Sequence, residues 1–370
     1  LIANAAAPDP VDIDPIEDIA VLQYTGGTTG RSKGAELTHR NIVTNAYQMQ
    51  AVQDDGLVPD GANALAALPL YHIFAFTFTM VNGLLQGRHT IVVPSPRPPT
   101  NLKAVFEKYK ITVFPAVNTL FAALLKEPWF TRDIARHMTL CVAGGTALQE
   151  SVANTWREKF DIAIYQGYGL TESSCALTFM PQDRVKTNSI GVPLPDIGIQ
   201  IVDDDGNEVP IGESGELIAK GPNIMKGYLN RPDETAETIQ DGWLYTGDVA
   251  KMDEDGYLFI VDRKKDMILV SGFNVYPNEL EDAIAHISGV AEVAVIGVPD
   301  EHSGEAPKAF IVKADEGLTG EDVLAHCKGC LTGYKRPREI EFVDEIPKSP
   351  VGKPLRMELR KMEMAKRENA

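Results

Sequence analysis

The chain has 370 residues, of which 44% are hydrophobic and 24% charged, as is typical of a globular protein with two or more domains. The formal net charge of −17 argues against a nucleic-acid-binding protein, because such proteins present basic surfaces to phosphates. Four cysteines are too few for a disulfide scaffold, so the composition favours a reducing cytoplasm.

The first twenty residues are acidic, rich in Pro and Ala, and carry no basic segment that would indicate a signal peptide. We expect them to come from the middle of a longer protein. The most apolar stretch is Leu65–Leu85, but Pro69, His72 and Asn82 interrupt it. This pattern favours a buried wall over a helix that crosses a bilayer.

A loop at Tyr24–Ala35 contains four glycines, three threonines and one serine. An apolar strand ending at Ile19–Leu22 precedes it, and a helix at His39–Gln50 follows it. Glycine lets the backbone approach an anion, and free N–H groups and hydroxyls donate to its oxygens. The order of Lys33 and Gly34 differs from that of the usual P-loop. The pattern by itself leaves two interpretations open, a phosphate cradle and a plain surface turn.

Strands and helices alternate over the next part of the chain. Apolar runs predict strands at Leu65–Leu70, Ile91–Pro94, Ile111–Phe114, Leu140–Ala143 and Ile162–Tyr165. Helical patterns lie between them at Leu102–Lys110, Asn118–Lys126 and Ala147–Phe160. This alternation predicts an α/β fold with a mostly parallel sheet, and ligands bind at the carboxyl ends of such strands. Gly144–Gly145 and Gly167–Gly169 occupy two of those ends.

From Ile197 onward, short strands and turns predict a small β-barrel, with a hairpin turn at Asp255–Gly256. The charged run Asp262–Asp266 is expected to be a linker. A compact α+β unit follows, with helices at Asn278–His286 and Gly320–Cys330, strands at Val293–Val298 and Ala309–Lys313, and a basic amphipathic helix at Pro354–Glu368. We therefore predict two domains, residues 1–262 and 263–370.

Four stretches follow the Gly/Thr loop in a specific order: Gly167–Glu172 (GYGLTE), Tyr245–Asp248 (YTGD), Asp262–Phe273 (DRKKDMILVSGF) and Pro347–Lys353 (PKSPVGK). Together with the loop they resemble the adenylate-forming enzymes. Within that superfamily the loop and the linker are most similar to those of bacterial long-chain fatty-acid–CoA ligases. The resemblance implies a large N-terminal domain, here lacking its first part, and a small C-terminal lid that carries the catalytic lysine.

The resemblance also implies a reaction. ATP, with Mg²⁺, would activate a fatty acid to acyl-AMP, and CoA would then displace AMP. The first step brings two anions together, so positioning and charge neutralisation dominate catalysis. The implied partners are these small molecules, in the cytoplasm, with contact at the inner face of the cell membrane conceivable for a lipid substrate.

Site residues follow from matching positions. Lys353 would touch both the carboxylate and the α-phosphate, Thr171 the α-phosphate, and Glu172 with Thr25 the Mg²⁺ ion. His72 would lie beside the carboxylate and Phe76 at the acyl pocket. Lys265 would be the hinge, Gly272 and Phe273 would line the CoA path, and Tyr334–Arg336 could meet CoA phosphates. The implied ATP- and AMP-binding residues are Tyr24, Thr25, Gly26, Gly27, Thr28, Thr29, Gly30, Lys33, Gly144, Gly145, Thr146, Gly167, Tyr168, Gly169, Asp248 and Arg263.

Each of these side chains also has a structural interpretation. Lys353 could be a solvated lysine of a basic tail, Glu172 a carboxylate that favours a helix start, and Tyr168 a buried structural tyrosine. His72, beside several phenylalanines, could be a packed core residue. Two other functions stay open: an adenylating enzyme with a different acid or acceptor, and a fragment that binds nucleotide without turnover.

Overall fold

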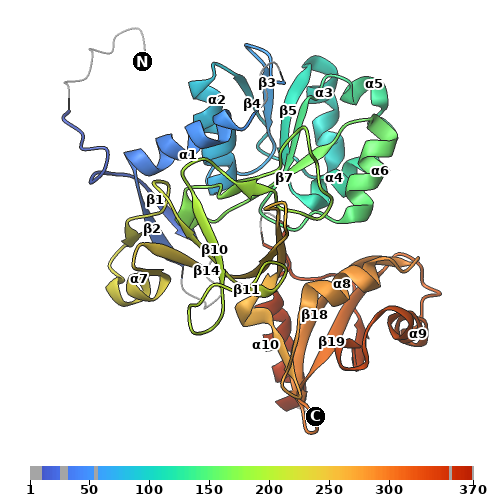
Figure 1. Ribbon diagram of the computed structural model, residues 1–370. Coiled ribbons are helices and arrows are strands. Elements are labelled where there is room, and N and C mark those ends of the chain that lie inside the picture. Colours follow the sequence, from blue (N-terminus) through green and yellow to red (C-terminus); the bar gives the residue numbers. More distant parts are fainter. Residues whose placement is uncertain (1–10, 26–31, 54–56, 350–351, 369–370) are drawn as a thin grey trace.

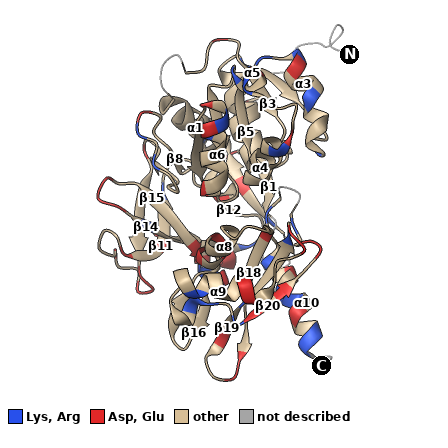
Figure 2. Ribbon diagram, turned by 90° about the vertical axis from the view of Figure 1, so that its right-hand side faces the viewer, with Lys and Arg blue, Asp and Glu red and all other residues tan. Residues whose placement is uncertain are grey.

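The computed structural model describes residues 11–25, 32–53, 57–349 and 352–368. It separates into a large N-terminal part and a smaller C-terminal part, each with hydrophobic core clusters of its own. The large part ends at β15 (Leu258–Arg263), and the small part, the lid, begins at the short helix η5 (Lys264–Asp266). In both Figure 1 and Figure 2 the two parts meet near α8 (Pro277–Ala285). The predicted α/β fold with a second, smaller α+β part is confirmed.

A seven-stranded sheet forms the centre of the large part, in the order β4-β3-β5-β6-β7-β8-β9. Its first five strands are parallel and its last two pairings are antiparallel. The strands are β3 (Asn63–Ala66), β4 (His89–Val92), β5 (Ile111–Ala116), β6 (Leu140–Ala143), β7 (Ile164–Tyr168), β8 (Thr178–Phe179) and β9 (Val192–Pro193). The carboxyl ends of β6 and β7 therefore lie side by side, as the predicted glycine turns require.

Helices cover this sheet with an aromatic core. They are η3 (Pro99–Leu102), α3 (Lys103–Lys108), α4 (Asn118–Lys126), α5 (Arg132–Ala135) and α6 (Glu150–Phe160). Trp156 of α6 is fully buried, and its ring centroid lies 4.9 Å from that of Phe121 of α4. Edge-to-face contacts of this kind add to the burial of two large apolar side chains, so α4 and α6 are fixed against the sheet that carries the site.

A β-hairpin, rather than a single strand, holds the Gly/Thr loop. β1 (Ile19–Thr25) pairs antiparallel with β2 (Lys33–Thr38), and Thr25 lies opposite Lys33. The predicted order of strand, loop and helix was therefore wrong, because β2 intervenes before α1 (His39–Ala51). A capping box of Thr38 and Asn41 begins that helix. β12 (Gly227–Tyr228) pairs with the other edge of β2.

The apolar stretch Leu65–Leu85 contains a π-helix, η2 (Phe74–Val81), that continues into α2 (Asn82–Leu85). The N–H of Asn82 donates to the carbonyl of Thr77, five residues back. Phe74, Ala75 and Phe78 of this helix are buried in the core. This agrees with the predicted buried wall. Among the residues that the structure describes, no helix is long and apolar enough to cross a membrane.

The second sheet of the large part is open, which corrects the predicted β-barrel. Its path is β10-β11-β14-β13, with β15 also on β14. Closure would require β10 to pair with β15, and among the described strands β10 pairs with β11 and β15 with β14. The strands are β10 (Gly198–Val202), β11 (Ser214–Lys220), β13 (Ile239–Gln240), β14 (Trp243–Met252) and β15, and α7 (Pro232–Thr238) directly precedes β13. The short helix η4 (Thr171–Ser173) lies between β7 and β8 of the central sheet.

The lid is a five-stranded sheet with helices. Its path is β17-β16-β19-β18, with β20 parallel to β19. The elements are β16 (Ile268–Val270), β17 (Phe273–Val275), α8, β18 (Val290–Asp300), β19 (Gly304–Lys313), α9 (Gly320–Cys330), η6 (Gly333–Lys335), β20 (Glu339–Phe342) and α10 (Arg356–Glu368). Basic and acidic residues alternate along α10, as Figure 2 shows. The charged run expected to be a linker starts inside β15, where Asp262 is fully buried.

Candidate active site

Tyr168, Asp248 and Arg263 form one polar cluster at the junction of the two parts. β7 carries Tyr168, and the pairing of β14 with β15 sets Asp248 opposite Arg263. The Tyr168 hydroxyl donates to Asp248 Oδ2 at 2.7 Å, and Arg263 Nε lies 3.3 Å from Asp248 Oδ1. Burial and the neighbouring Asp248 carboxylate raise the pKa of Tyr168, so the phenol stays protonated and donates. Each carboxylate oxygen can accept a further hydrogen bond, as a ribose would require.

Glu172 lies in η4, directly after the glycine turn that follows β7. The hydroxyl of Tyr228 donates to Glu172 Oε1 at 2.6 Å, which fixes the carboxylate and leaves its second oxygen to bind a cation. Burial and Glu172 raise the pKa of Tyr228. Tyr228 was not among the predicted site residues, since it lies 56 positions away along the chain and no local motif marks it.

Lys33 belongs to the same neighbourhood. Its Nζ lies 2.5 Å from Glu234 Oε2 and 4.9 Å from the centroid of the Tyr228 ring. The pairing of β2 with β12 brings Lys33 and Tyr228 together. A lysine with one carboxylate partner in this position could still turn toward a phosphate, because its ammonium has three donors.

Lys353 lies on the lid, within electrostatic reach of Arg263 and Asp248 of this cluster. Its backbone N–H donates to Ser349 Oγ at 3.1 Å, and its carbonyl accepts from the Ser349 N–H at 2.8 Å, so the segment folds back on itself. Burial and the Arg263 guanidinium lower the pKa of Lys353 to about 7, and Asp248, Arg356 and Lys265 also act on it. A cation in such surroundings is stabilised when an anion arrives.

Gly352 allows the Lys353 turn to approach the large part. It adopts a φ of +82°, and a Cβ at this position would lie 2.9 Å from both Arg97 Nη2 and Thr119 Oγ1. The Thr119 hydroxyl is buried without a hydrogen-bond partner among the described residues. A larger residue in place of Gly352 would therefore push the lysine turn away.

His72 lies near Lys353. Burial and the Lys353 charge lower the pKa of His72, and the Phe74 N–H donates to His72 Nδ1 at 3.3 Å. The histidine is therefore neutral near pH 7, with its proton on Nε2. A groove of about 600 Å³ is lined by Phe76, Leu70, Tyr71 and Met80 together with residues 21–24 of β1. Most of this lining is apolar, which is compatible with the predicted acyl pocket.

The glycines predicted to bind nucleotide differ in how much space their surroundings leave for a side chain. A Cβ on Gly169 would lie 1.9 Å from the Cys175 carbonyl oxygen, so packing alone requires that glycine. A Cβ on Gly167 would meet the Phe179 ring at 3.3 Å, and one on Gly144 the Phe74 ring at 3.2 Å. Gly145 has a φ of +76° in open space. Next to it, the buried hydroxyl of Thr146 has no partner among the described residues, which suits a ligand that donates or accepts there.

The remaining predicted residues are placed as follows. Tyr24 is exposed beside Gly34, and Thr25 ends β1. Gly26, Gly27, Thr28, Thr29 and Gly30 lie outside the described residues. Thr171 begins η4, and burial and Arg263 lower the pKa of Lys265 in η5 to about 8. These positions are compatible with the predicted roles, which stay predictions.

The predicted CoA path lies on the lid, apart from the cluster. Phe273 is exposed and stacks on Tyr334, with ring centroids 4.8 Å apart, and Gly272 has a φ of +84°. Lys335 is paired with Glu279 at 2.7 Å, and Arg336 donates to the backbone carbonyl of Leu331. These cations already have protein partners, so the structure gives no separate support for CoA phosphates at Tyr334–Arg336.

Comparison with known families gives two matches along the chain. The family described as AMP-binding enzyme matches residues 2–229, and the AMP-binding enzyme C-terminal domain matches residues 279–353. The long-chain-fatty-acid–CoA ligase of Salmonella typhimurium is 50% identical over 345 residues, which cover 93% of this chain and 62% of that protein. The chain thus spans less than two thirds of the length of this curated relative.

Solved structures match as well. ATP-bound MatB from Rhodopseudomonas palustris is 34% identical with a TM-score of 0.91, over 97% of this chain and 71% of that one. Apo MatB from the same organism, at 33% identity and the same coverage, gives a TM-score of 0.75. The arrangement described here is therefore closer to the ATP-bound structure than to the apo structure.

Proposed function

Because the chain belongs to the AMP-binding enzyme family, we propose that it is the adenylating and lid-bearing portion of a long-chain fatty-acid–CoA ligase. A carboxylate oxygen of the fatty acid attacks the α-phosphorus of ATP, and the bond to pyrophosphate breaks. The CoA thiol then loses its proton and attacks the acyl carbon, and AMP leaves. The observation that carries this proposal is the packing of the Lys353 turn of the lid against the large part at Gly352, which brings Lys353 within electrostatic reach of His72, Asp248 and Arg263.

Lys353 has the character that the first step needs. Two anions must meet, and a cation between them offsets their repulsion. Without anions, burial and Arg263 disfavour its charge. Binding of ATP and the acid restores the ammonium form, so the charge becomes available when both substrates are present.

The nucleotide would lie over the junction. Asp248, held by Tyr168 and Arg263, suits the two ribose hydroxyls, and the Thr146 hydroxyl suits the edge of the base. Thr171 and Lys33 would bind phosphates together with the loop of residues 26–31. Glu172 and Thr25 would hold Mg²⁺, and the Tyr228 hydrogen bond fits this role because it orients the carboxylate. Bound Mg²⁺ supplies neutralisation of phosphate charge.

The groove beside Phe76 supports a fatty acid as the substrate. Most of its lining is apolar, and His72, which directly follows Tyr71 of that lining in the chain, is neutral and can donate a hydrogen bond without adding a charge. The identity of 50% to long-chain ligases favours a long acid, whereas the groove itself fits several apolar acids. Such a substrate would bring the protein to a membrane surface, and cosedimentation with anionic vesicles would test that contact.

The second step would use the other face of the lid. Rotation about Lys265 would withdraw Lys353 and bring Gly272 and Phe273 toward the acyl-adenylate. The boundary between residues 262 and 263 predicted from the sequence would then lie two residues before the pivot.

The direct test is turnover. The protein is mixed with palmitate, ATP, Mg²⁺ and CoA, and AMP and pyrophosphate are measured. We expect both products, and we expect Lys353→Ala to abolish them while calorimetry still detects ATP binding. Lys361→Ala on α10 is the matched control, since Lys361 is exposed and pairs with Glu358 of the same helix. Release of AMP without CoA, or only with another thiol, would indicate a different acceptor. ATP binding without turnover by the unmutated protein would overturn the proposal.

A further inference from the structure

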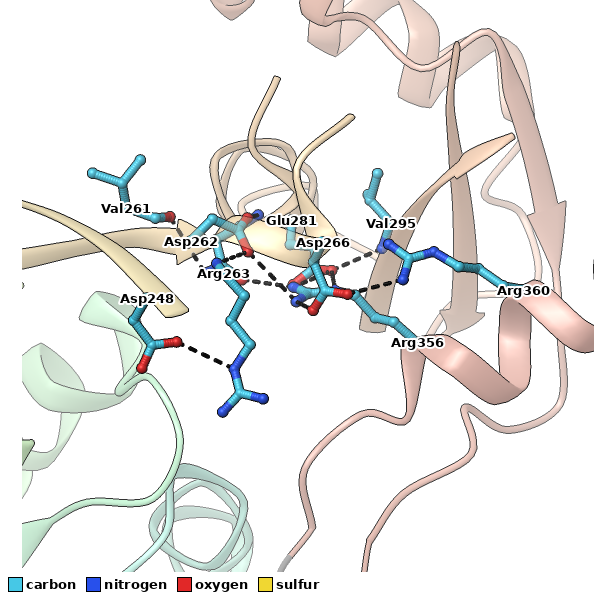
Figure 3. A network of polar contacts seen from close by, with 10 residues as sticks. Asp248, Val261, Asp262, Arg263, Asp266, Glu281, Val295, Arg356 and Arg360 are labelled. Carbon is cyan, nitrogen blue, oxygen red and sulfur yellow. Dashed lines mark hydrogen bonds and ion pairs between the residues drawn. The ribbon is translucent and has the colours of Figure 1, made fainter. Parts of the chain in front are cut away.

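Asp262 joins the large part to the lid across the predicted pivot. The residue is on β15, and its backbone is held in the large part by pairing with Val249 of β14. Its side chain points the other way, toward α8 and α10 of the lid (Figure 3). It is fully buried, so its contacts are made at the expense of hydration and must be specific.

The contacts of Asp262 that cross the pivot are few and direct. Oδ2 accepts from the backbone N–H of Asn278 in the first turn of α8 at 2.8 Å, and Arg356 Nη1 lies 3.7 Å from Oδ1. The Asn278 side chain also donates to the carbonyl of Val261 at 3.3 Å. A carboxylate at the start of a helix is favoured by the free N–H groups and the helix dipole. These contacts exist only while α8 stays beside β15.

Arg356 holds the lid side of this contact without depending on it. Its guanidinium lies 2.8 Å from Glu281 Oε2, 2.6 Å from Asn278 Oδ1 and 3.3 Å from Asp266 Oδ2. Arg360 adds a second bond to Asp266 at 3.0 Å. All these partners follow Lys265 in the chain, so rotation of the lid would carry them together. The network in Figure 3 thus divides into contacts within the lid and the contacts that cross the pivot, which are those of the Asp262 carboxylate and of the Val261 carbonyl.

The crossing contact is also linked to the nucleotide side. Asp262 Oδ1 accepts from the backbone N–H of Arg263 at 2.6 Å, and the Arg263 side chain pairs with Asp248. Lys353 lies three residues before Arg356, in the turn that precedes α10. The contact between Asp262 and Arg356 is therefore only one residue from Arg263 and three residues from Lys353. It fixes the position of the Arg263–Asp248 pair and of the turn that carries Lys353.

We propose that Asp262 is a positioning residue that latches the lid in the arrangement in which Lys353 reaches the nucleotide, and that the latch opens when the lid turns for the thioester step. This inference rests on the proposed function, because it assigns Asp262 to one half-reaction and not to the other. Burial raises the pKa of Asp262 to about 6 despite Arg356, so the latch is predominantly charged at pH 7.5.

The test compares Asp262→Asn with Glu363→Gln. Glu363 is a buried lid carboxylate bonded to Lys308 and Arg367, so it loses similar contacts without crossing the pivot. Adenylation is measured as palmitate-dependent exchange of pyrophosphate into ATP. Thioester formation is measured by supplying palmitoyl-adenylate and CoA. Thermal unfolding shows that each variant is folded.

Loss of one hydrogen-bonded charge should lower the exchange rate of Asp262→Asn about tenfold and leave thioester formation within about twofold. Glu363→Gln should change both half-reactions by the same factor. Equal loss of both in Asp262→Asn, or loss of neither, would overturn the latch.

A second readout separates this inference from the proposed function. Opening of the latch should expose the peptide bonds after Lys264 and Lys265, so trypsin should cut Asp262→Asn there faster than the unmutated protein or Glu363→Gln. If the unmutated protein catalyses neither half-reaction, the proposed function fails, and the trypsin comparison still decides the latch. Equal cleavage of all three proteins would contradict it.

Discussion

The lowered pKa of Lys353 can be measured directly in the ligand-free protein. With a pKa of about 7, roughly 90% of this amine would be neutral at pH 8, compared with less than about 1% for an ordinary lysine. Only the neutral amine reacts with acetic anhydride. We therefore expect acetylation of Lys353 to rise with a midpoint near pH 7, about three units below the midpoint of an exposed lysine.

The assay is competitive acetylation at a series of pH values, followed by mass spectrometry of each lysine peptide. Exposed Lys361 serves as the internal control, because it lies on the surface of α10. A midpoint is used instead of a rate, since burial slows the reagent without moving the midpoint. Acetylation of Lys353 in step with Lys361 would refute the reasoning that burial and Arg263 disfavour its charge.

Substrates should reverse the effect with a definite sign. ATP and a fatty acid place negative charge beside the ammonium, so their binding raises the pKa of Lys353 and protects it at pH 8. The same sign governs kinetics. Because the charged form assists adenylation, kcat/KM should fall about tenfold per pH unit above pH 7, whereas kcat, which reports the bound complex, should fall only at higher pH. A kcat/KM that rises from pH 7 to pH 9 would contradict a cationic role.

Three further substitutions test other parts of the site. Tyr228→Phe removes the hydroxyl that orients Glu172. We expect the Mg²⁺ concentration for half-maximal adenylation, measured by magnesium titration, to rise about tenfold. Unchanged thermal stability of the variant is the control. Gly352→Ala adds a Cβ 2.9 Å from Thr119 Oγ1, so pyrophosphate exchange should fall more than about tenfold. Thioester formation from palmitoyl-adenylate should persist. An exchange rate equal to that of the unmutated protein would show that the turn need not approach so closely. Gly169→Ala places a Cβ 1.9 Å from the Cys175 carbonyl oxygen. We therefore expect urea titration to show a loss of about 3 kcal/mol or more in the free energy of unfolding. An unchanged urea midpoint would indicate that ligand binding, and not packing, requires this glycine.

Local signals predicted much of the fold. The helices at Asn118–Lys126 and Gly320–Cys330 and the strand at Leu140–Ala143 have the predicted bounds, because apolar periodicity and neighbouring turn residues define each within its own sequence. Pairing between distant segments was not readable in this way. β2 is a strand because it pairs with β1 and β12, which lie on either side of it. The expected barrel is open because β10 pairs with β11 and β15 pairs with β14, and not with each other.

The same distinction applies to the site. Asp248, Arg263 and Lys353 could be named because each lies in a motif that resembles a known family. Tyr228 and Asp262 could not, since their importance comes from contacts with residues 56 and 16 positions away. Their side chains are ordinary in sequence, a tyrosine in a short strand and an acid in a charged run, and only the folded chain shows what they touch.

The π-helix at Phe74–Val81 gives the groove a property that its side chains alone do not have. Successive residues of an α-helix are separated by about 100° around its axis. Deletion of one residue from this wider helix would let it adopt the tighter α form without disturbing α2. Each side chain on the N-terminal side of the deletion would then point in a new direction. Phe76 would then no longer line the groove, and a neighbouring side chain of different size would take its place. If this groove holds the acid, as proposed above, a length change of a single codon in the helix would alter acid preference with no substitution in the wall.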